Sequence, residues 1–427
     1  MTFKIITLGC KVNSYESEIM KELLLKEGYK EIDDNPEVVI INTCSVTNMA
    51  DNKSKKMVRR YRREYPNTIL VVCGCSSQNN QDTYNTMDID ILLGNKDKTK
   101  IVSILDDYKK NKKKYVKFYN ERDLEFEDMV TKEFSSHTRA FVKIQDGCDN
   151  FCSYCIIPYV RGSIRSKDFD ETIKEIEELA KNGHKEVVLT GIHTGSYGVG
   201  TDHDLTDLIH EISKIDELKR IRISSIEVTE LNDKFLNELK NNSKICNHMH
   251  IPLQAGSDEV LKRMNRKYDL EYFFNKIDAI RKIRPDINIS TDVIVGHPYE
   301  TEELFNKAID TCKKIKFAKI HVFPYSKRDG TPAARMPMQV DDAEKKRRSK
   351  ELVALSNELE KEYSKKFIGQ TLEVLIEENY DNKSIGHTSN FIRVEIPDNL
   401  ETNKMYDIEI TVDIIWCKTG VYTSVFL

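Results

Sequence analysis

Three cysteines lie close enough in the sequence for one loop to direct their thiolates toward a single centre: Cys148, Cys152 and Cys155. Iron–sulfur clusters are held by cysteine thiolates, usually four, so three from one loop leave a corner open for another ligand. The alternatives are a structural zinc site with a distant fourth ligand, or buried thiols. Zinc sites favour a second pair of cysteines or histidines, and none follows here. The spacing therefore favours an iron–sulfur cluster.

Three predicted strands in the first hundred residues also end at cysteines. The apolar runs are 3–8, 38–43 and 69–72. Cys10 and Cys44 follow the first two, and Cys73 and Cys75 both follow the third. Strand alternation would point this last pair to the same face, so periodicity does not separate them. Each cysteine alone is consistent with a small core residue. Because ligands bind at the carboxyl edge of open α/β sheets, the recurrence predicts a shared metal site.

The composition is that of a globular protein, with 39% hydrophobic and 32% charged residues among 427. No apolar run reaches about 18 residues and the start lacks the apolar core of a signal peptide, so we expect no membrane span and no export. Ten cysteines in a chain of this length indicate metal binding in a reducing cytoplasm more than a disulfide scaffold. With a net charge of −4, nucleic-acid binding would depend on local basic patches.

The strongest basic patch is the predicted helix 53–63, which contains seven lysines and arginines. One interpretation is a phosphate-contacting helix, with Lys55, Arg59 and Arg62 as the contacts, because phosphates dominate nucleic-acid affinity. The other is a solvated helix face. For a second run, 109–114, we favour the solvated interpretation.

From residue 138 the pattern alternates between strands and helices. Strands are predicted at 140–144, 186–190, 220–224, 248–252, 287–294 and 319–323. Six β/α units imply a parallel sheet with right-handed crossovers, which curls toward a barrel. Six units are too few for the closed barrel of eight.

The C-x3-C-x2-C motif with Tyr154 before its last cysteine resembles the radical S-adenosylmethionine (SAM) superfamily. The resemblance implies an open, partial (β/α)6 barrel. It also implies that Cys148, Cys152 and Cys155 hold a 4Fe–4S cluster whose fourth iron is chelated by SAM, with Tyr154 near the adenine.

Further strand ends resemble SAM-contacting segments of that superfamily. The implied contacts are Arg165, Gly191, Ser225, Glu227 and Gln254. Arg165 would meet the SAM carboxylate, and the glycine would let the backbone approach the SAM amino group. One segment departs from the usual G-F-P-G-E: this chain has His297 and Tyr299 within residues 296–300.

The amino-terminal motifs 7–17, 41–48 and 74–78 resemble the methylthiotransferases within this superfamily. The resemblance implies a second, auxiliary 4Fe–4S cluster held by Cys10, Cys44 and Cys75. Residues 386–391, G-H-T-S-N-F, resemble the TRAM module, a small β-barrel expected to have five strands. The predicted organisation is an amino-terminal α/β domain with a parallel sheet (1–112), a linker (113–136), the radical SAM core (137–366) and the TRAM domain (367–427).

The segments 7–13 and 41–51 most resemble the members that add a methylthio group to carbon 2 of N6-threonylcarbamoyladenosine at position 37 of tRNA. In that family one SAM methylates a sulfur on the auxiliary cluster, and another is cleaved to a 5′-deoxyadenosyl radical that activates the target carbon. The resemblance implies a cytoplasmic monomer that binds tRNA and takes electrons from a flavodoxin or ferredoxin.

The alternatives are siblings that act on isopentenyladenosine in tRNA or on a ribosomal-protein aspartate. Two further alternatives belong to other functional classes: an iron–sulfur tRNA-binding protein and an electron carrier. The intact cysteine motif and the SAM-like strand ends argue against a pure binder. An electron carrier needs neither a barrel nor a terminal nucleic-acid module.

Overall fold

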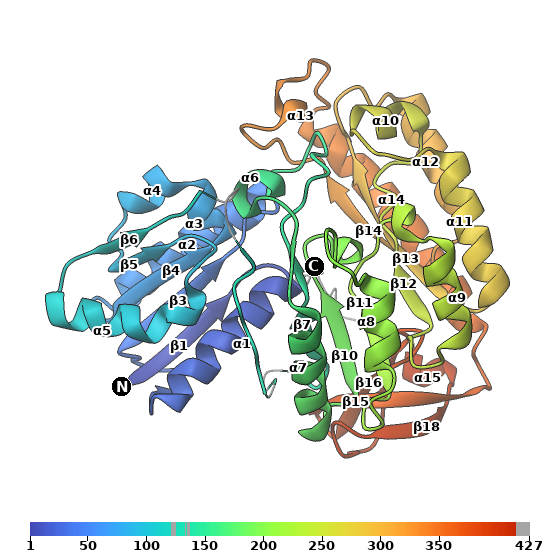
Figure 1. Cartoon of the computed structure of the whole chain (residues 1–427). Helices are drawn as coiled ribbons and strands as arrows, with labels where there is room; N and C mark the ends of the chain where they lie inside the picture. The colour runs from blue at the N-terminus through green and yellow to red at the C-terminus, as the bar shows by residue number, and fades with distance from the viewer. Residues whose placement is uncertain (121–124, 133, 135–136, 416–427) are drawn as a thin grey trace.

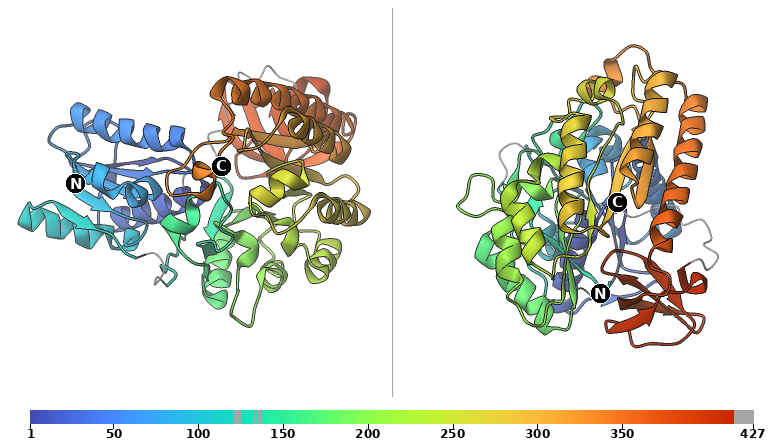
Figure 2. Two further views of the ribbon diagram at one scale, coloured as in Figure 1. Left: turned by 90° about the horizontal axis from the view of Figure 1, so that it is seen from above. Right: turned by 90° about the vertical axis from the view of Figure 1, so that its right-hand side faces the viewer.

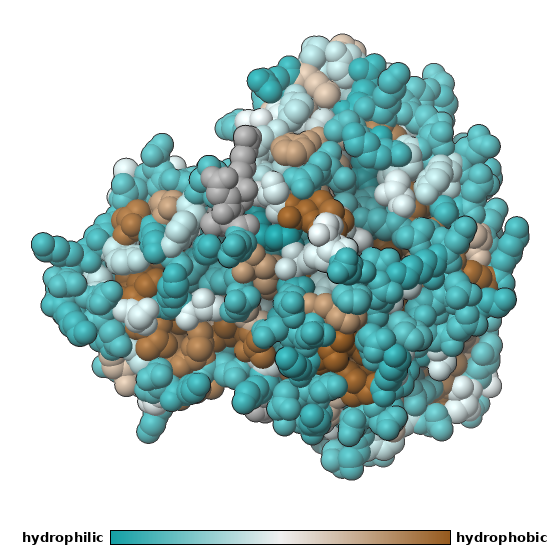
Figure 3. Space-filling model, in the orientation of Figure 1, coloured by the Kyte–Doolittle hydropathy of each residue, from teal (hydrophilic) through white to brown (hydrophobic). Residues whose placement is uncertain are grey.

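The computed structural model describes residues 1–120, 125–132, 134 and 137–415. An amino-terminal α/β domain lies beside a curved parallel core, and a carboxy-terminal antiparallel sheet packs below that core (Figures 1 and 2). The face seen in Figure 3 is mostly hydrophilic. No helix in the described part of the chain is both long and apolar enough to cross a membrane.

The amino-terminal domain is built on a six-stranded parallel sheet. In sheet order its strands are β2 (Lys30–Glu31), β1 (Thr2–Thr7), β3 (Val38–Thr43), β4 (Ile69–Gly74), β5 (Ile91–Leu93) and β6 (Tyr115–Lys117). Helices α1 (Lys11–Lys26) and α5 (Ile101–Asn111) pack on one face, and α2 (Asn48–Glu64) and α4 (Gln81–Asn85) on the other. The predicted strands were continuous apolar runs because both faces of this sheet are buried.

The segment assigned to the linker begins with a strand of this sheet. Tyr115 in β6 pairs with Ile91 of β5, so the sheet extends beyond residue 112. Further along, Met129 and Phe134 are each 1% exposed and belong to the hydrophobic core of the central domain. The described part of the segment therefore packs onto both domains.

The central domain has six parallel strands, as the sequence predicted. They are β7 (Ala140–Lys143), β10 (Glu186–Thr190), β11 (Arg220–Ile223), β12 (His248–His250), β13 (Asn288–Val295) and β14 (Lys319–Pro324). They form two three-stranded sheets, β7-β10-β11 and β12-β13-β14, joined by a bridge between Ile221 and Ile245. The two outer strands, β7 and β14, do not pair, so the barrel is open.

Helices cover the outside of this partial barrel (Figure 1). They are α7 (Phe169–Lys181), α8 (Leu205–Ile212), α9 (Asp233–Asn241), α10 (Asp258–Arg263), α11 (Leu270–Ile283), α12 (Glu302–Ile315) and α14 (Asp342–Lys365). Their amino ends begin at capping residues, such as Asp168 for α7 and Thr301 for α12. The open side of the barrel faces the amino-terminal domain, where α1 packs against β7.

The carboxy-terminal module is a four-stranded antiparallel sheet within the described residues. Its order is β17 (Arg393–Ile396), β16 (Lys383–Thr388), β15 (Thr371–Tyr380) and β18 (Met405–Glu409). The predicted run 407–412 ends as a strand at Glu409, and the short helix α15 (Val412–Ile415) follows. A fifth strand would have to come from residues 416–427, which lie outside the described residues.

The segment 386–391 joins this module to the partial barrel. The Phe391 ring stacks on His248 of β12 at 4.9 Å between ring centroids, and the guanidinium of Arg222 lies 4.6 Å from it. Asn288 of β13 also donates to the backbone carbonyl of Asn390 at 2.9 Å. These residues are therefore engaged in an interdomain contact.

Candidate functional site

Cys10, Cys44 and Cys75 lie at the carboxyl edge of the amino-terminal sheet. Cys10 is the N-cap of α1, Cys44 follows β3, and Cys75 begins the short helix α3 (Cys75–Asn79). A Cβ atom on Gly9 would lie 2.9 Å from Cys44 Cβ, so the missing side chain lets the first two segments approach. Burial raises the pKa of Cys44 to about 12, and the nearby Cys10 and Cys75 add to the effect. The three thiols therefore lie within electrostatic range of one another.

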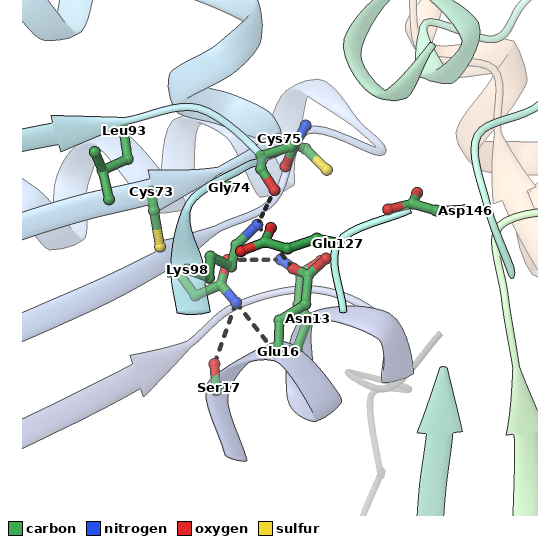
Figure 4. Close-up of polar contacts among 12 residues, drawn as sticks. Asn13, Glu16, Ser17, Cys73, Gly74, Cys75, Leu93, Lys98, Glu127 and Asp146 are labelled. Atoms are coloured by element: carbon green, nitrogen blue, oxygen red, sulfur yellow. Dashed lines mark hydrogen bonds and ion pairs between the residues drawn. The ribbon is translucent and has the colours of Figure 1, made fainter. Parts of the chain in front are cut away.

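The structure separates Cys73 from Cys75, which strand alternation could not. Gly74 between them has φ +104°, and a Cβ there would lie 2.5 Å from the Thr43 carbonyl oxygen. Cys73 is fully buried in the cluster beneath α1 and α5, whereas Cys75 packs against Ile156 on the other domain. Figure 4 shows the two sulfurs pointing in different directions. The expectation that both point to one face was wrong because alternation ends at Gly74.

The second cysteine set lies in the loop between β8 (Gln145–Asp146) and α6 (Ile157–Arg161). Backbone hydrogen bonds fold this loop: Cys148 N–H donates to Gly162 at 3.0 Å, and Cys155 N–H donates to Cys152 at 3.0 Å. Burial raises the pKa of Cys155 to about 12, and the charges of Cys152 and Cys148 also contribute. The three thiolates would repel one another, so a cationic cluster that binds all three would stabilise their ionised forms.

Neither set has the close spacing that one shared metal ion requires. Among the described residues, no group of three His, Cys, Asp or Glu side chains could hold a single ion. In a cubane each thiolate binds a different iron, so the sulfurs lie further apart than the ligands of a tetrahedral zinc ion. The donor type and number of each set fit a 4Fe–4S cluster.

Arg161 connects the first cysteine set to the segment before the second cysteine loop. This side chain is fully buried, and its Nε donates to Cys75 Sγ at 3.2 Å. Its other nitrogens donate to Glu16 Oε1 at 2.9 Å, Asp146 Oδ1 at 3.2 Å and Asn13 Oδ1 at 3.1 Å. Glu16 and Asn13 belong to α1, whereas Asp146 precedes the second cysteine loop. One guanidinium therefore binds residues of both domains, beside Cys75 and the segment before the second cysteine loop.

Glu16 is the centre of the same buried charge network. Besides Arg161, its carboxylate lies 3.1 Å from Lys98 (Figure 4) and 2.9 Å from Lys143. Burial alone would raise the pKa of Glu16, but the three cations hold it below its ordinary value. Sequence reasoning missed both Arg161 and Glu16. The only signal was an arginine directly after the cysteine loop.

Two further side chains contact the second cysteine set. Arg266 donates from Nη1 to Cys152 Sγ at 3.3 Å and forms an ion pair with Glu227, one of the predicted SAM contacts. His193 lies 2.5 Å from Glu230 Oε1. Burial opposes protonation of this histidine, but Cys148 and Glu230 raise its pKa to about 10. His193 is therefore in contact with this set.

Two other predicted SAM contacts lie at strand ends of the open barrel. Gly191 follows β10, and a Cβ there would lie 2.9 Å from Gln145 Oε1. Gln254 has φ +64°, and its backbone N–H donates to Asp292 of β13 at 2.8 Å. Both backbones are therefore held close to their neighbours, and both residues remain partly accessible.

The remaining predicted contacts differ in their surroundings. Tyr154 packs against the central core, and Ser225 is partly accessible after β11. Arg165 donates to the Arg161 carbonyl at 2.6 Å and pairs with Asp146 at 3.3 Å, so a SAM carboxylate would compete with these contacts.

Residues 296–300, which differ from the usual G-F-P-G-E, contact the second cysteine loop. His297 is fully buried and lies 3.2 Å from Ser153 Oγ, and burial lowers its pKa to about 4. Tyr299 has φ +67° and lies under the guanidinium of Arg263 at 4.0 Å. His297 therefore contacts the loop as a neutral side chain.

The predicted phosphate contacts of α2 are not equivalent. Lys55 pairs with Asp51 at 2.8 Å, and Arg62 pairs with Asp90 at 2.5 Å, so these two stabilise the domain. Arg59 is exposed. The cations of α2 that are exposed and form no ion pair with another described residue are Lys53, Lys56, Arg59 and Arg63.

Two family models match the chain: the radical SAM superfamily over residues 142–312, and the uncharacterized protein family UPF0004 over residues 2–94. Among solved structures, the radical SAM methyltransferase TsrM from Kitasatospora setae superposes with a TM-score of 0.55 at 13% identity, covering 78% of this chain and 76% of that one. This likeness supports the fold.

Curated relatives match nearly the whole chain. The threonylcarbamoyladenosine tRNA methylthiotransferase MtaB of Bacillus subtilis is 42% identical over 91% of this chain and 88% of its own length. The protein of the same name from Thermotoga maritima is 38% identical over 88% and 86%. A tRNA-2-methylthio-N(6)-dimethylallyladenosine synthase from a Thermoanaerobacter species is 34% identical over 99% and 93%. With its two cysteine sets and its open barrel, the chain belongs to the radical SAM methylthiotransferase family.

Proposed function

We propose that this protein adds a methylthio group to carbon 2 of N6-threonylcarbamoyladenosine at position 37 of tRNA. Two 4Fe–4S clusters would take part. Cys148, Cys152 and Cys155 would hold the SAM-binding cluster, and the auxiliary cluster would be bound by Cys10, Cys44 and Cys75. The relatives at 42% and 38% identity have the name of this activity, whereas relatives named for dimethylallyladenosine are 34% to 36% identical.

The observation that carries the proposal is that Arg161 links Cys75 of the first cysteine set to the segment that leads into the second cysteine loop. Transfer of a sulfur-bound group to an unactivated ring carbon requires both centres to reach one substrate. Arg161 contacts Cys75 directly and also Asp146, two residues before Cys148. When bound, the clusters and SAM supply the redox and group-transfer chemistry, and the protein supplies orientation and exclusion of water.

The chain's own residues have roles that follow from their contacts. Burial raises the pKa of Cys152, and Arg266 beside it opposes this effect and so favours the thiolate form that binds iron. His193 lies beside Cys148. The network around Glu16 holds the amino-terminal domain against the barrel and fixes the separation of the two cysteine sets. Gly191 and Gln254 present backbone at the strand ends where SAM would bind.

Other parts of the proposal concern partners. Exposed cations of α2 would bind tRNA phosphates, and the carboxy-terminal module, proposed to be a TRAM domain, would assist. We further propose a cytoplasmic monomer reduced by a flavodoxin or ferredoxin. We keep the domain limits proposed from the sequence except for the end of the first domain, which we place at Lys117 so that the domain includes β6.

Nucleoside analysis of tRNA tests the activity. Deletion of the gene should remove 2-methylthio-N6-threonylcarbamoyladenosine and leave its unmethylthiolated precursor, and the intact chain should restore it. Loss of the methylthio derivative of isopentenyladenosine would instead show the sibling activity. Unchanged tRNA nucleosides would contradict both.

Iron analysis tests the two sites separately. Anaerobic reconstitution should give about eight irons per chain, as expected for two clusters of the 4Fe–4S type. Replacing Cys148, Cys152 and Cys155 with alanine should leave about four irons and abolish SAM cleavage. Tightly bound zinc without iron would refute the assignment.

A further inference from the structure

Two exposed aromatic side chains lie at the loop that holds the second cysteine set. Phe151 directly precedes Cys152 and is 42% exposed, and Tyr159 of α6 is 46% exposed. Their rings meet edge to face, with the ring centroids 5.7 Å apart. Apolar side chains that gather on a surface and are bordered by polar residues are typical of a contact site for another molecule. Neither ring has a role in the site described above.

The backbone of Phe151 is held in an unusual conformation. Its φ of +46° lies in the left-handed region, which is uncommon for a bulky side chain. Asn265, in the turn after α10, donates from Nδ2 to the Phe151 carbonyl at 3.1 Å and to the Asn150 carbonyl at 3.3 Å. Strained backbone of this kind persists where its surroundings impose it, and it is concentrated at functional sites. The fold therefore keeps the Phe151 ring at the surface against a backbone preference.

Three exposed cations lie on the barrel side of this aromatic pair. Lys262 and Arg263 end α10, and Lys267 lies two residues after Asn265. The Asn265 N–H donates to the Lys262 carbonyl at 3.1 Å, and Lys267 Nζ donates to Asn265 Oδ1 at 3.2 Å. None of the three cations forms an ion pair with another residue that the structure describes. The cysteine loop itself adds one exposed carboxylate, Asp149, so the patch is positively charged in a chain whose net charge is −4.

We propose that this patch is the docking surface for the protein that reduces the SAM-binding cluster, a small acidic one-electron carrier. The patch consists of Phe151, Tyr159, Lys262, Arg263 and Lys267. The inference rests on the proposed function and adds the place where the carrier binds. The carrier gives up one electron, which is consumed in the cleavage of SAM. Electron transfer slows steeply with distance, so the carrier must dock beside the second cysteine loop, and Phe151 is bonded directly to Cys152.

The charge and the size of the patch both fit such a carrier. Cations at the rim attract an acidic partner and speed its encounter with the surface. Transient electron-transfer contacts are among the smallest protein interfaces, and aromatic side chains supply much of the energy of an interface centre. RNA is also an anion, and its bases stack on aromatic rings. The carrier is the better occupant because electron delivery, unlike phosphate binding, requires a surface next to the cysteine loop.

The test compares carrier binding, electron delivery and tRNA binding in the full chain after anaerobic reconstitution. The probe is flavodoxin, whose affinity is measured in its oxidised form. SAM cleavage is driven either by reduced flavodoxin or by dithionite, a small reductant that needs no docking surface. One variant is Phe151→Asn, because asparagine tolerates the left-handed conformation. The other combines Lys262→Glu with Lys267→Glu. The matched control combines Lys282→Glu with Lys313→Glu, which reverses exposed lysines on the outer helices α11 and α12.

Both patch variants should bind flavodoxin about tenfold more weakly, through loss of an aromatic anchor or of electrostatic attraction. SAM cleavage at limiting flavodoxin should fall by a similar factor. Dithionite-driven cleavage, iron content and tRNA affinity should match the wild type, and the control should match it in every measurement.

Flavodoxin affinity equal to that of the wild type in the patch variants would overturn the inference. A loss of tRNA affinity with unchanged flavodoxin affinity would also overturn it and would assign the patch to RNA. Failure of the proposed function looks different: the wild type would then form no methylthio product on tRNA even with dithionite.

Discussion

Replacing Arg161 with methionine should loosen the contact between the amino-terminal domain and the barrel. The change removes charged hydrogen bonds to Glu16 and Asp146 from a fully buried site. Breaking a buried ion pair costs about 3–5 kcal/mol. Lys98 and Lys143 remain beside Glu16, so we expect the lower limit, about 3 kcal/mol. This corresponds to about a hundredfold change in the opening equilibrium at 1.36 kcal/mol per tenfold.

Hydrogen exchange measures this opening without requiring two-state unfolding of a multidomain protein. Amides of α1 that exchange through separation of the domains should exchange about a hundredfold faster in Arg161→Met. Arg161→Lys should be intermediate, because lysine keeps the charge without the planar fork. The control is Arg60→Met, an exposed pair with Glu64 whose loss should change exchange little. Equal exchange of α1 in Arg161→Met and wild type would refute the view that this network holds the domains together.

Two other predictions concern the metal and RNA sites. Cys75→Ala should lose the auxiliary iron, about four atoms, and keep SAM cleavage. Cys73→Ala should keep both clusters, because the Cys73 sulfur lies in the core. Iron analysis showing the reverse would contradict the assignment. Reversing Lys56, Arg59 and Arg63 together should weaken tRNA binding and flatten its salt dependence, because each neutralised phosphate releases counterions. Filter binding across a salt series measures this, and slopes equal to the wild type would mean that α2 presents only a solvated face.

Sequence alone was sufficient for the features that repeat locally. The strands of the parallel sheets are apolar runs between helical patterns, because each strand is buried on one or both faces and this leaves a continuous signal. Val38–Thr43 and Glu186–Thr190 have the predicted bounds. The cysteine loop could also be predicted, because its three thiols lie within eight residues of the sequence. Such features depend on neighbours in the chain and can be predicted without a fold.

The tertiary structure decided what depends on residues distant in the chain. Arg161 and Glu16 are 145 residues apart, so no local pattern joins them. The pairing of Lys55 and Arg62 with carboxylates could not be read from a run of like charges. Even between the adjacent Cys73 and Cys75, a single left-handed glycine changed the direction of the sulfurs. The sequence predicted which groups would carry the chemistry. Packing between the domains decided which side chains contact one another, because those contacts join residues far apart in the chain.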